Sequence, residues 1–436
     1  MEIMKYERSL QLSGDYGVIV AGSGPSGICA AIAAARQGVK VAIIERYGVV
    51  GGNLTSGCVG PIMGSVSKGT LRDELTYRLS VDSNDMLGWE GRVHDIDFAK
   101  GELLNFLNEE GVDVFLQTPI VDTISDNGKI KGVVISTKEG LTVLKSDVTV
   151  DATGDGDVAF LAGAEYQLGR ESDSRLQPVT LMYVLSGVDD SKAIICIGEA
   201  DTVPFNGEPF PKFTQRCCDN GLLPENTGAV RLYPTVYPGE RLVNTTQVND
   251  IIPTKTTDVT KAELILRKQI NEINNFLRKY VPGYENCKVK YSANTLGVRE
   301  SRRFTGDYSL TVDDIRNGKR QQDVVVHSAN FCIDIHNPAG SGQAESFDKV
   351  FDNKAYDIPY RCLLPRRVDN LLLTGRCISG THHAHASYRV MSICMALGEA
   401  SGIAAALSAK QKVTPRELDY KLIQNELIKI GVNLFE

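Results

Sequence analysis

A glycine-rich segment near the start of the chain has the residue types and spacing of a phosphate-binding turn. It follows the β-branched run Val18–Val20 and precedes an alanine-rich stretch, 28–37, which predicts a strand, a turn and a helix. Its first glycine permits the tight turn, its second admits a pyrophosphate, and its third lets the helix pack against the strand. The free N–H groups at the helix start would bind the phosphates. The segment consists of Gly22, Ser23, Gly24, Pro25, Ser26 and Gly27. The alternative is a glycine-rich turn in some other α/β protein.

Glu45 ends the second apolar run, Lys40–Glu45, 18 residues after Gly27. A carboxylate at that place can accept hydrogen bonds from both ribose hydroxyls of a dinucleotide, and it would repel the additional phosphate of NADP. Arg46 and then the pair Gly51-Gly52, followed by Asn53, come directly afterwards. A second close-approach loop suits FAD better than NAD, because FAD is the longer molecule. An ordinary turn is the alternative for this loop.

Three later segments are expected to return the chain to the same nucleotide site. A predicted strand, Leu144–Asp151, leads into an acidic loop, which lacks the further ligands of a calcium loop. A second strand, Asn370–Thr374, leads into another glycine turn, and a long helix, about Tyr388–Ala409, follows. The helix start could stabilise a reduced flavin. The cofactor contacts expected from these later segments, together with one residue after the strand near 113–117, are Val121, Thr153, Gly154, Asp157, Gly375, Arg376, Arg389 and Val390.

Six histidines offer the proton donors and acceptors that flavin-linked oxidation needs, because an ordinary histidine titrates near neutral pH. His382, His383 and His385 lie between two segments expected at the flavin, and His336 belongs to the short acidic stretch Asp334-Ile-His336. We predict these four residues and Arg361 as the catalytic set. Helix capping, backbone contacts or metal binding are the alternatives for the histidine cluster, although no carboxylate or cysteine nearby completes a metal site.

Arginines could bind an anionic substrate, because the guanidinium fork pairs with a carboxylate through two hydrogen bonds. Besides Arg361, the candidates are Arg299, Arg302 and Arg303. The pair Arg302-Arg303 could instead form salt bridges with Glu300 and Asp307.

The order of these elements predicts an α/β fold in which a Rossmann-like FAD-binding domain contains an inserted α+β substrate domain. We expect the first part of the FAD-binding domain over residues 1–164, the substrate domain that caps the flavin over 165–330, and the second part over 331–436. The middle region is more polar and less periodic, and it contains an amphipathic helix at about Lys261–Tyr280.

Composition excludes several other classes of protein. The net charge of −7 over 436 residues argues against nucleic-acid binding. No stretch approaches the ~20 uncharged apolar residues that span a bilayer, and the start does not resemble a signal peptide. The ten cysteines contain no C-x-x-C pair, which argues against a structural metal site and a redox dithiol. We expect most of them to be buried thiols in a protein of the reducing cytoplasm.

Together with Gly297–Arg303, Asp334–His336 and Ile358–Arg361, these motifs resemble the FAD-dependent oxidoreductase family of the glutathione-reductase structural type. That family is distantly similar to the fumarate reductase flavoprotein and the heterodisulfide reductase flavoprotein subunit. The resemblance covers most of the chain and is weakest over 170–285. It implies non-covalently bound FAD with a substrate domain capping the flavin ring.

Two departures limit what the resemblance implies. The cysteine spacing of the iron–sulfur relatives is missing, so we expect no cluster. Residues 53–61 contain no histidine, so we expect no covalent link to FAD.

No second glycine fingerprint follows a strand, so electrons must enter or leave through the substrate pocket, molecular oxygen or an electron-transfer protein.

The sequence therefore predicts an enzyme that transfers a hydride between FAD and a small polar or anionic organic substrate. An NAD-dependent dehydrogenase with a single Rossmann domain is one alternative, and the absence of a flavin colour would identify it. A flavin-holding electron-transfer subunit without a substrate of its own is the other.

Overall fold

The computed structural model describes residues 4, 7–80, 94–198, 202–344 and 347–435. Its largest sheet has the strand order β3-β2-β1-β6, and these strands run parallel to one another. Short β-branched and aliphatic runs form the strands because both faces of the sheet are covered. The last strand, β17, pairs with the end of β6 and brings the C-terminal third of the chain back to the sheet. The bounds are β1 Gln11–Ala21, β2 Val41–Ile44, β3 Asp113–Phe115, β6 Gly140–Asp151 and β17 Leu371–Leu373.

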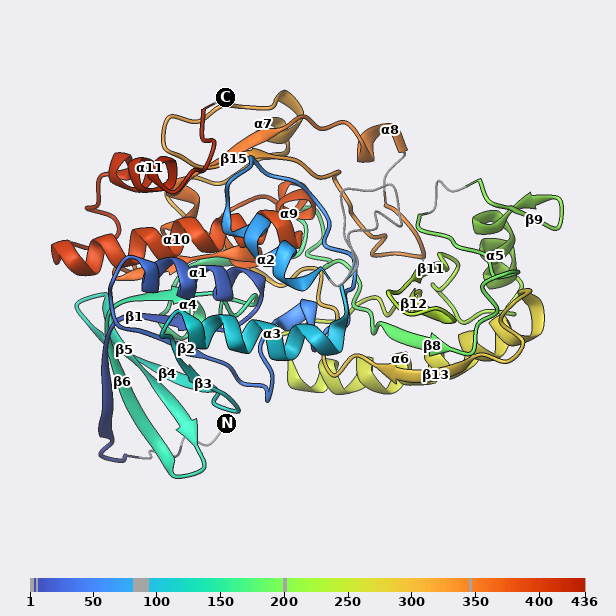
Figure 1. Cartoon of the computed structure of the whole chain (residues 1–436), viewed down its shortest axis with the longest axis horizontal. Helices are drawn as coiled ribbons and strands as arrows, with labels where there is room; N and C mark the ends of the chain where they lie inside the picture. The colour runs from blue at the N-terminus through green and yellow to red at the C-terminus, as the bar shows by residue number, and fades with distance from the viewer. Residues whose placement is uncertain (1–3, 5–6, 81–93, 199–201, 345–346, 436) are drawn as a thin grey trace.

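Helices cover one face of this sheet and a β-meander covers the other (Figure 1). Helices α1 (Pro25–Arg36) and α10 (Met391–Gln411) lie side by side over the first face, with α3 (Ile96–Glu109) beside them. The meander consists of β4 (Ile120–Asp126), β5 (Lys129–Thr137) and the first half of β6, which pair antiparallel. This three-layer arrangement confirms the predicted Rossmann-like domain.

The two central helices approach closely because glycine stands at their contacts. A Cβ atom at Gly398 would overlap the carbonyl oxygen of Ser26, and one at Gly402 would overlap that of Ala30. The long helix predicted to begin at Tyr388 is in fact divided. The segment α9 (His382–Tyr388) ends at Arg389, and Val390 is extended before α10 begins. Arg389 is therefore at a bend between two helices.

Among the described residues, α10 alone combines the length and hydropathy of a membrane-spanning helix, and 94% of its most apolar window is buried inside the molecule. The same properties are typical of the central helix of a folded core. The cysteines are mostly buried, as predicted, and all ten are free thiols.

A second part of the molecule, the cap, lies on the right in Figure 1. Its antiparallel sheet has the order β11-β12-β8-β13 and packs against two helices. A separate hydrophobic core runs from Val179 to Ala293 and also includes Cys58 and Ile96. The bounds are β8 Tyr183–Ser186, α5 Phe210–Asp219, β11 Arg231–Pro234, β12 Glu240–Asn244, α6 Thr256–Tyr280 and β13 Lys288–Ser292.

This second core lies inside the expected insertion, 165–330, but the end of that range packs elsewhere. Phe304, Leu310, Ile315 and Val324 belong to the first core. The exact domain limits stay a proposal, with the second core supporting a cap of about 179–293.

The remaining elements are distributed over both parts of the molecule. They are η1 Gly52–Leu54, α2 Leu71–Leu79, α4 Asp157–Leu161, β7 Tyr166–Leu168, β9 Pro204–Phe205, β10 Glu208–Pro209, β14 Arg302–Phe304, α7 Val312–Asn317, β15 Val324–Ala329, α8 Phe347–Val350, β16 Tyr356–Pro359, η2 Tyr360–Leu363, η3 Gly375–Cys377 and α11 Tyr420–Lys429.

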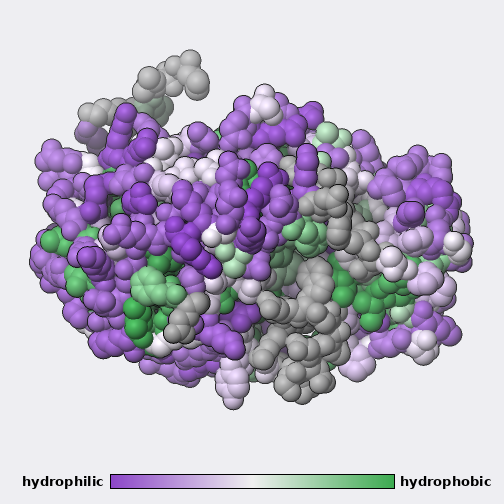
Figure 2. Space-filling view, turned by 90° about the horizontal axis from the view of Figure 1, so that it is seen from above, coloured by the Kyte–Doolittle hydropathy of each residue, from purple (hydrophilic) through white to green (hydrophobic). Residues whose placement is uncertain are grey.

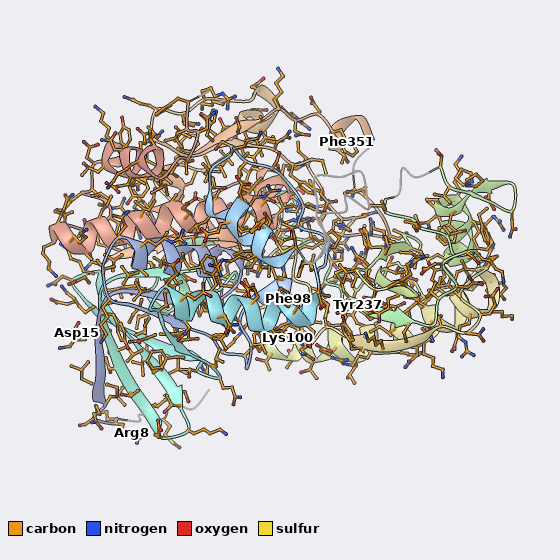
Figure 3. The ribbon with its side chains drawn as sticks, in the orientation of Figure 1. Arg8, Asp15, Phe98, Lys100, Tyr237 and Phe351 are labelled. Atoms are coloured by element: carbon orange, nitrogen blue, oxygen red, sulfur yellow. The ribbon has the colours of Figure 1, made fainter. Side chains whose placement is uncertain are left out.

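The two parts of the molecule meet beside α3. In Figure 3, Phe98 and Tyr237 lie at this junction, one from α3 and the other from the loop between β11 and β12. The Tyr237 hydroxyl donates to the carboxylate of Asp95, which caps α3. The Asn294 N–H also donates to the carbonyl oxygen of Ser56 at 2.9 Å. These contacts hold the cap against the FAD-binding part.

Candidate active site and cofactor groove

The glycine-rich turn lies where β1 ends and α1 begins, as predicted. Gly22 has a φ of 89°, and a Cβ atom there would lie 2.7 Å from the carbonyl oxygen of Ala152. A Cβ atom at Gly27 would overlap the Gly22 carbonyl oxygen, whereas one at Gly24 would meet nothing within 4 Å. Gly24 caps α1 without any side-chain hydrogen bond. The helix thus presents uncapped N–H groups to an open groove, which fits a pyrophosphate.

Glu45 lines the same groove, but its carboxylate also orders the turn. One oxygen accepts from the N–H of Ser23 at 2.9 Å and from its hydroxyl at 2.6 Å, and the other accepts from the Tyr47 N–H at 2.9 Å. Two carboxylate oxygens offer about four acceptor sites, so one remains for a ribose hydroxyl. Gly52 packs against the glycine turn, since a Cβ atom there would lie 2.9 Å from Gly24 Cα. The second close-approach loop therefore borders the groove as expected.

An acidic loop after β6 supports the opposite wall. Asp155 accepts from the Ser301 hydroxyl at 2.6 Å and from Arg376 at 2.7 Å. Asp157 pairs with Arg302 at 2.9 Å and, at 3.7 Å, with Arg46. These contacts join the loop to strand β14 and to the turn after β17. They explain why distant segments line a single groove.

The groove adjoins a second cavity of about 750 Å³, which is lined by residues of both the FAD-binding part and the cap. Arg389 and Met391 line both spaces at the bend before α10, and Asn53 and Val298 do so from other segments. The cavity is lined on the cap side by residues of β11 and β12 and on its rim by Phe351, which Figure 3 labels near α8. An isoalloxazine ring that continues from the groove would therefore face this cavity.

Asp334 is the acidic centre of the cavity. One of its oxygens accepts from Arg389 at 2.9 Å and lies 3.3 Å from His336 Nε2, and the other accepts from Gln343 at 2.5 Å. Burial opposes ionisation of Asp334, but His336 and Arg389 hold its pKa well below the usual range. Burial, together with the charge of Arg299, lowers the pKa of His336 to about 3, so this ring is neutral at pH 7.

The structure brings most of the predicted cofactor residues to the groove. Those that line it are Gly22, Gly24, Pro25, Ser26, Glu45, Arg46, Gly52, Asn53, Thr153, Gly154, Asp157, Arg376 and Arg389. Gly27 and Gly375 support its floor through close backbone packing, and Val390 lines only the neighbouring cavity. Val121 is 41% exposed on β4 and lines neither space, while its neighbour Ile120 lines the groove.

Of the predicted catalytic residues, only His336 lines the cavity. Arg361 is bound on the other side of the fold by Asp323, at 2.9 Å, and does not reach either space. His382, His383 and His385 of α9 also line neither space. His382 and His385 are buried and His383 is only partly buried, so their catalytic role stays a prediction that the lining of the two spaces does not support.

His382 belongs to a buried polar network instead. Its Nδ1 lies 2.9 Å from Glu300, which also pairs with Arg303 and accepts from the Gln177 N–H at 3.1 Å. The Gln177 side chain in turn accepts from the His336 N–H at 3.2 Å. The pair Arg303–Glu300 confirms the structural alternative for that arginine. The network positions the backbone that carries His336.

Sequence reasoning missed Asp334 and Arg231 as cavity residues. Asp334 stands two residues before His336, a spacing that could have indicated a pair. Arg231 is in β11 of the cap, and nothing in its surrounding sequence indicates chemistry. Among the described residues, no group of three or more histidine, cysteine, aspartate or glutamate side chains could hold a metal ion.

Comparison with known proteins agrees with this geometry. A 38% identical segment of 81 residues is shared with a soluble pyridine nucleotide transhydrogenase of Mycobacterium tuberculosis, covering 19% of this chain and 16% of that protein. A thiamine thiazole synthase of Thermotoga maritima is 28% identical over 162 residues, covering 35% and 62%. The chain thus matches less than two thirds of the length of these curated relatives.

Two solved structures share the fold at low sequence identity. An anhydrotetracycline hydroxylase from Streptomyces rimosus has a TM-score of 0.50 at 11% identity, covering 96% of this chain and 66% of that one. An aromatic hydroxylase from angucycline biosynthesis has a TM-score of 0.50 at 12% identity, covering 94% and 65%. A family model described as FAD dependent oxidoreductase matches residues 17–427. The chain therefore belongs to the FAD dependent oxidoreductase family.

Proposed function

We propose that this enzyme transfers a hydride between FAD and a small polar or anionic organic substrate that binds in the cavity beneath the cap. The observation that carries the proposal is that the nucleotide groove and the cavity share four lining residues, which are Asn53, Val298, Arg389 and Met391. A substrate in the cavity would lie against the flavin ring and be covered by the cap. FAD supplies the site that accepts or gives the hydride.

The chain's own residues supply positioning and a proton site. Asp334 is held by Arg389 and fixes the orientation of the His336 ring. If His336 Nε2–H donates to Asp334, Nδ1 is left without a proton and can accept one from a substrate hydroxyl or amine.

Anaerobic flavin reduction tests the proposal. FAD-loaded enzyme is mixed with a panel of hydroxy acids, amino acids and alcohols, and the absorbance near ~450 nm is followed. We expect at least one substrate class to bleach the flavin. Failure with every class, together with reduction by a protein donor, would instead support a flavin-holding electron-transfer subunit.

A matched pair of variants separates the proton site from the histidine cluster. His336→Gln is expected to slow flavin reduction by about 100-fold, the usual contribution of general acid–base catalysis, while FAD content stays unchanged. In His383→Ala, the flavin is expected to be reduced at the wild-type rate, because His383 lines neither the groove nor the cavity. Equal rates for His336→Gln and wild type would remove His336 from the mechanism.

A further inference from the structure

Arg299 is a buried cation in the wall of the substrate cavity. Its side chain is 8% exposed, and its Nη1 donates to the carbonyl oxygen of Pro178 at 2.8 Å. Among the residues that the structure describes, no carboxylate lies within ion-pair distance of Arg299. The nearby Asp334 contacts Arg389, His336 and Gln343 instead, and no ion pair joins it to Arg299.

Burial makes the charge of Arg299 costly. Burial and the neighbouring charge of Arg389 lower the pKa of Arg299 to about 9, while Asp334 opposes that effect. The group is therefore still a cation at pH 7. A buried cation without a carboxylate partner destabilises the folded protein unless a ligand compensates it.

The cavity also has a large apolar portion. Met63, Met182, Phe331 and Val350 line it together with the polar groups. An anionic ligand with an apolar body would thus satisfy both portions. Arg299 lines only the cavity and not the nucleotide groove, so the phosphates of FAD are not its partner.

We propose that Arg299 binds the carboxylate of the substrate, which is therefore an organic acid with an apolar body. This inference rests on the proposed function, because it names the substrate class of the same cavity. The planar guanidinium can hold the carboxylate through two parallel hydrogen bonds and so fix its orientation toward the flavin.

Binding of such an acid would also change His336. The charge of Arg299 is the strongest nearby charge that lowers the pKa of this ring, with Arg231 adding to the effect and Asp334 opposing it. A bound carboxylate would offset the charge of Arg299 and so remove one of the causes that lower the pKa of His336, while burial, the largest cause, would remain.

Ligand binding to the oxidised FAD-loaded enzyme tests the assignment without turnover. The probes are benzoate and hexanoate, each compared with its neutral amide, and the readout is the shift of the flavin absorbance. We expect the carboxylates to bind about 10- to 100-fold more tightly than the amides, the usual range for a charged hydrogen bond. Equal affinities in the wild-type enzyme would overturn the proposal.

Three variants assign the preference to Arg299. Arg299→Met is expected to remove the carboxylate preference, and Arg299→Lys to keep part of it. Arg216→Met is the control, because Arg216 is an exposed cap cation that pairs with Glu208 and does not line the cavity. A carboxylate preference that persists in Arg299→Met, or that disappears in Arg216→Met, would contradict the assignment. If Arg299→Met does not retain FAD, the carboxylate preference is measured in Arg299→Lys, provided that this variant has the FAD content of wild type. A preference that is weaker than in wild type then supports the assignment, and an unchanged preference contradicts it.

These outcomes separate the inference from the proposed function. Carboxylate binding that depends on Arg299 supports the inference even if no panel member reduces the flavin. Reduction by a neutral alcohol without any carboxylate preference would support hydride transfer and overturn the role of Arg299.

Discussion

Gly24 and Gly27 belong to the same glycine-rich turn but have different structural roles. Gly27 allows the turn and the helix to touch, so any side chain there disturbs the fold. Gly24 leaves open space where a Cβ atom would point, and its φ of −67° suits any residue. The fold itself does not need this open space, which is therefore available to the cofactor.

Gly24→Ala is expected to fold normally and to bind FAD at least about tenfold more weakly, a loss of about 1.4 kcal/mol, because the added methyl occupies the phosphate approach. Gly101→Ala is the matched control: Gly101 is exposed in α3, and its Cβ atom would also meet nothing within 4 Å. The measurements are FAD titration by fluorescence and thermal unfolding of the apoprotein. Unchanged FAD affinity in Gly24→Ala would show that the pyrophosphate lies elsewhere.

Helix α10 carries a buried carboxyl group that links it to α2. Glu399 is 2% exposed, and its side chain accepts from the Leu71 N–H at 3.0 Å, at the start of α2. Burial raises the pKa of Glu399 to about 7, and the neighbouring Asp73 and Glu74 contribute, while Leu71 and Arg36 oppose the shift. The folded protein therefore holds this proton more tightly than the unfolded chain does.

The sign of the resulting pH effect follows from proton linkage. Because the pKa is about 7 in the folded protein and 4.5 in the reference state, the carboxyl group costs stability increasingly as pH rises from about 4.5 to 7. Glu399→Gln keeps an acceptor for Leu71 but does not ionise. We expect the variant to be more stable than wild type at pH 8, by up to about 3 kcal/mol, with the difference vanishing near pH 4.5. Chemical unfolding at both pH values measures this; a constant difference would contradict it.

The molecule as a whole consists of the FAD-binding part and the cap, and residues of both line the cofactor groove. Pro253, Val259 and Asn294 of the cap line this groove opposite the glycine turn. On the face seen in Figure 2, hydrophilic side chains cover most of the surface, and the hydrophobic areas are small and separate.

FAD is expected to couple the unfolding of the two cores. Calorimetry of the apoprotein should show two unfolding transitions. FAD at 100 times its Kd should stabilise the folded, FAD-binding state by about 2.7 kcal/mol, so that the two transitions merge into one. A single transition that does not move with FAD concentration would exclude this coupling. Gly24→Ala serves as the control, since it should need more FAD for the same shift.

Local sequence determined the nucleotide-binding half of the fold. The strand, glycine turn and helix from Val18 to Arg36 are encoded within one short stretch, because the glycines have steric reasons to stand where they do. Glu45 follows for the same reason, since a fixed βαβ geometry sets its distance from the turn. The family resemblance and the cofactor could therefore be recognised from sequence.

Only the tertiary structure decided which polar residues share the substrate cavity. Arg299 and Arg361 look alike in sequence, yet one is buried in the cavity wall and the other is paired with Asp323 elsewhere. The three histidines of α9 looked catalytic from their place in the sequence, yet none of them lines the groove or the cavity. Burial and pairing depend on contacts with residues outside the local motif, such as Pro178 for Arg299 and Asp323 for Arg361. The free energy of a charge depends on those contacts and not on its sequence neighbours.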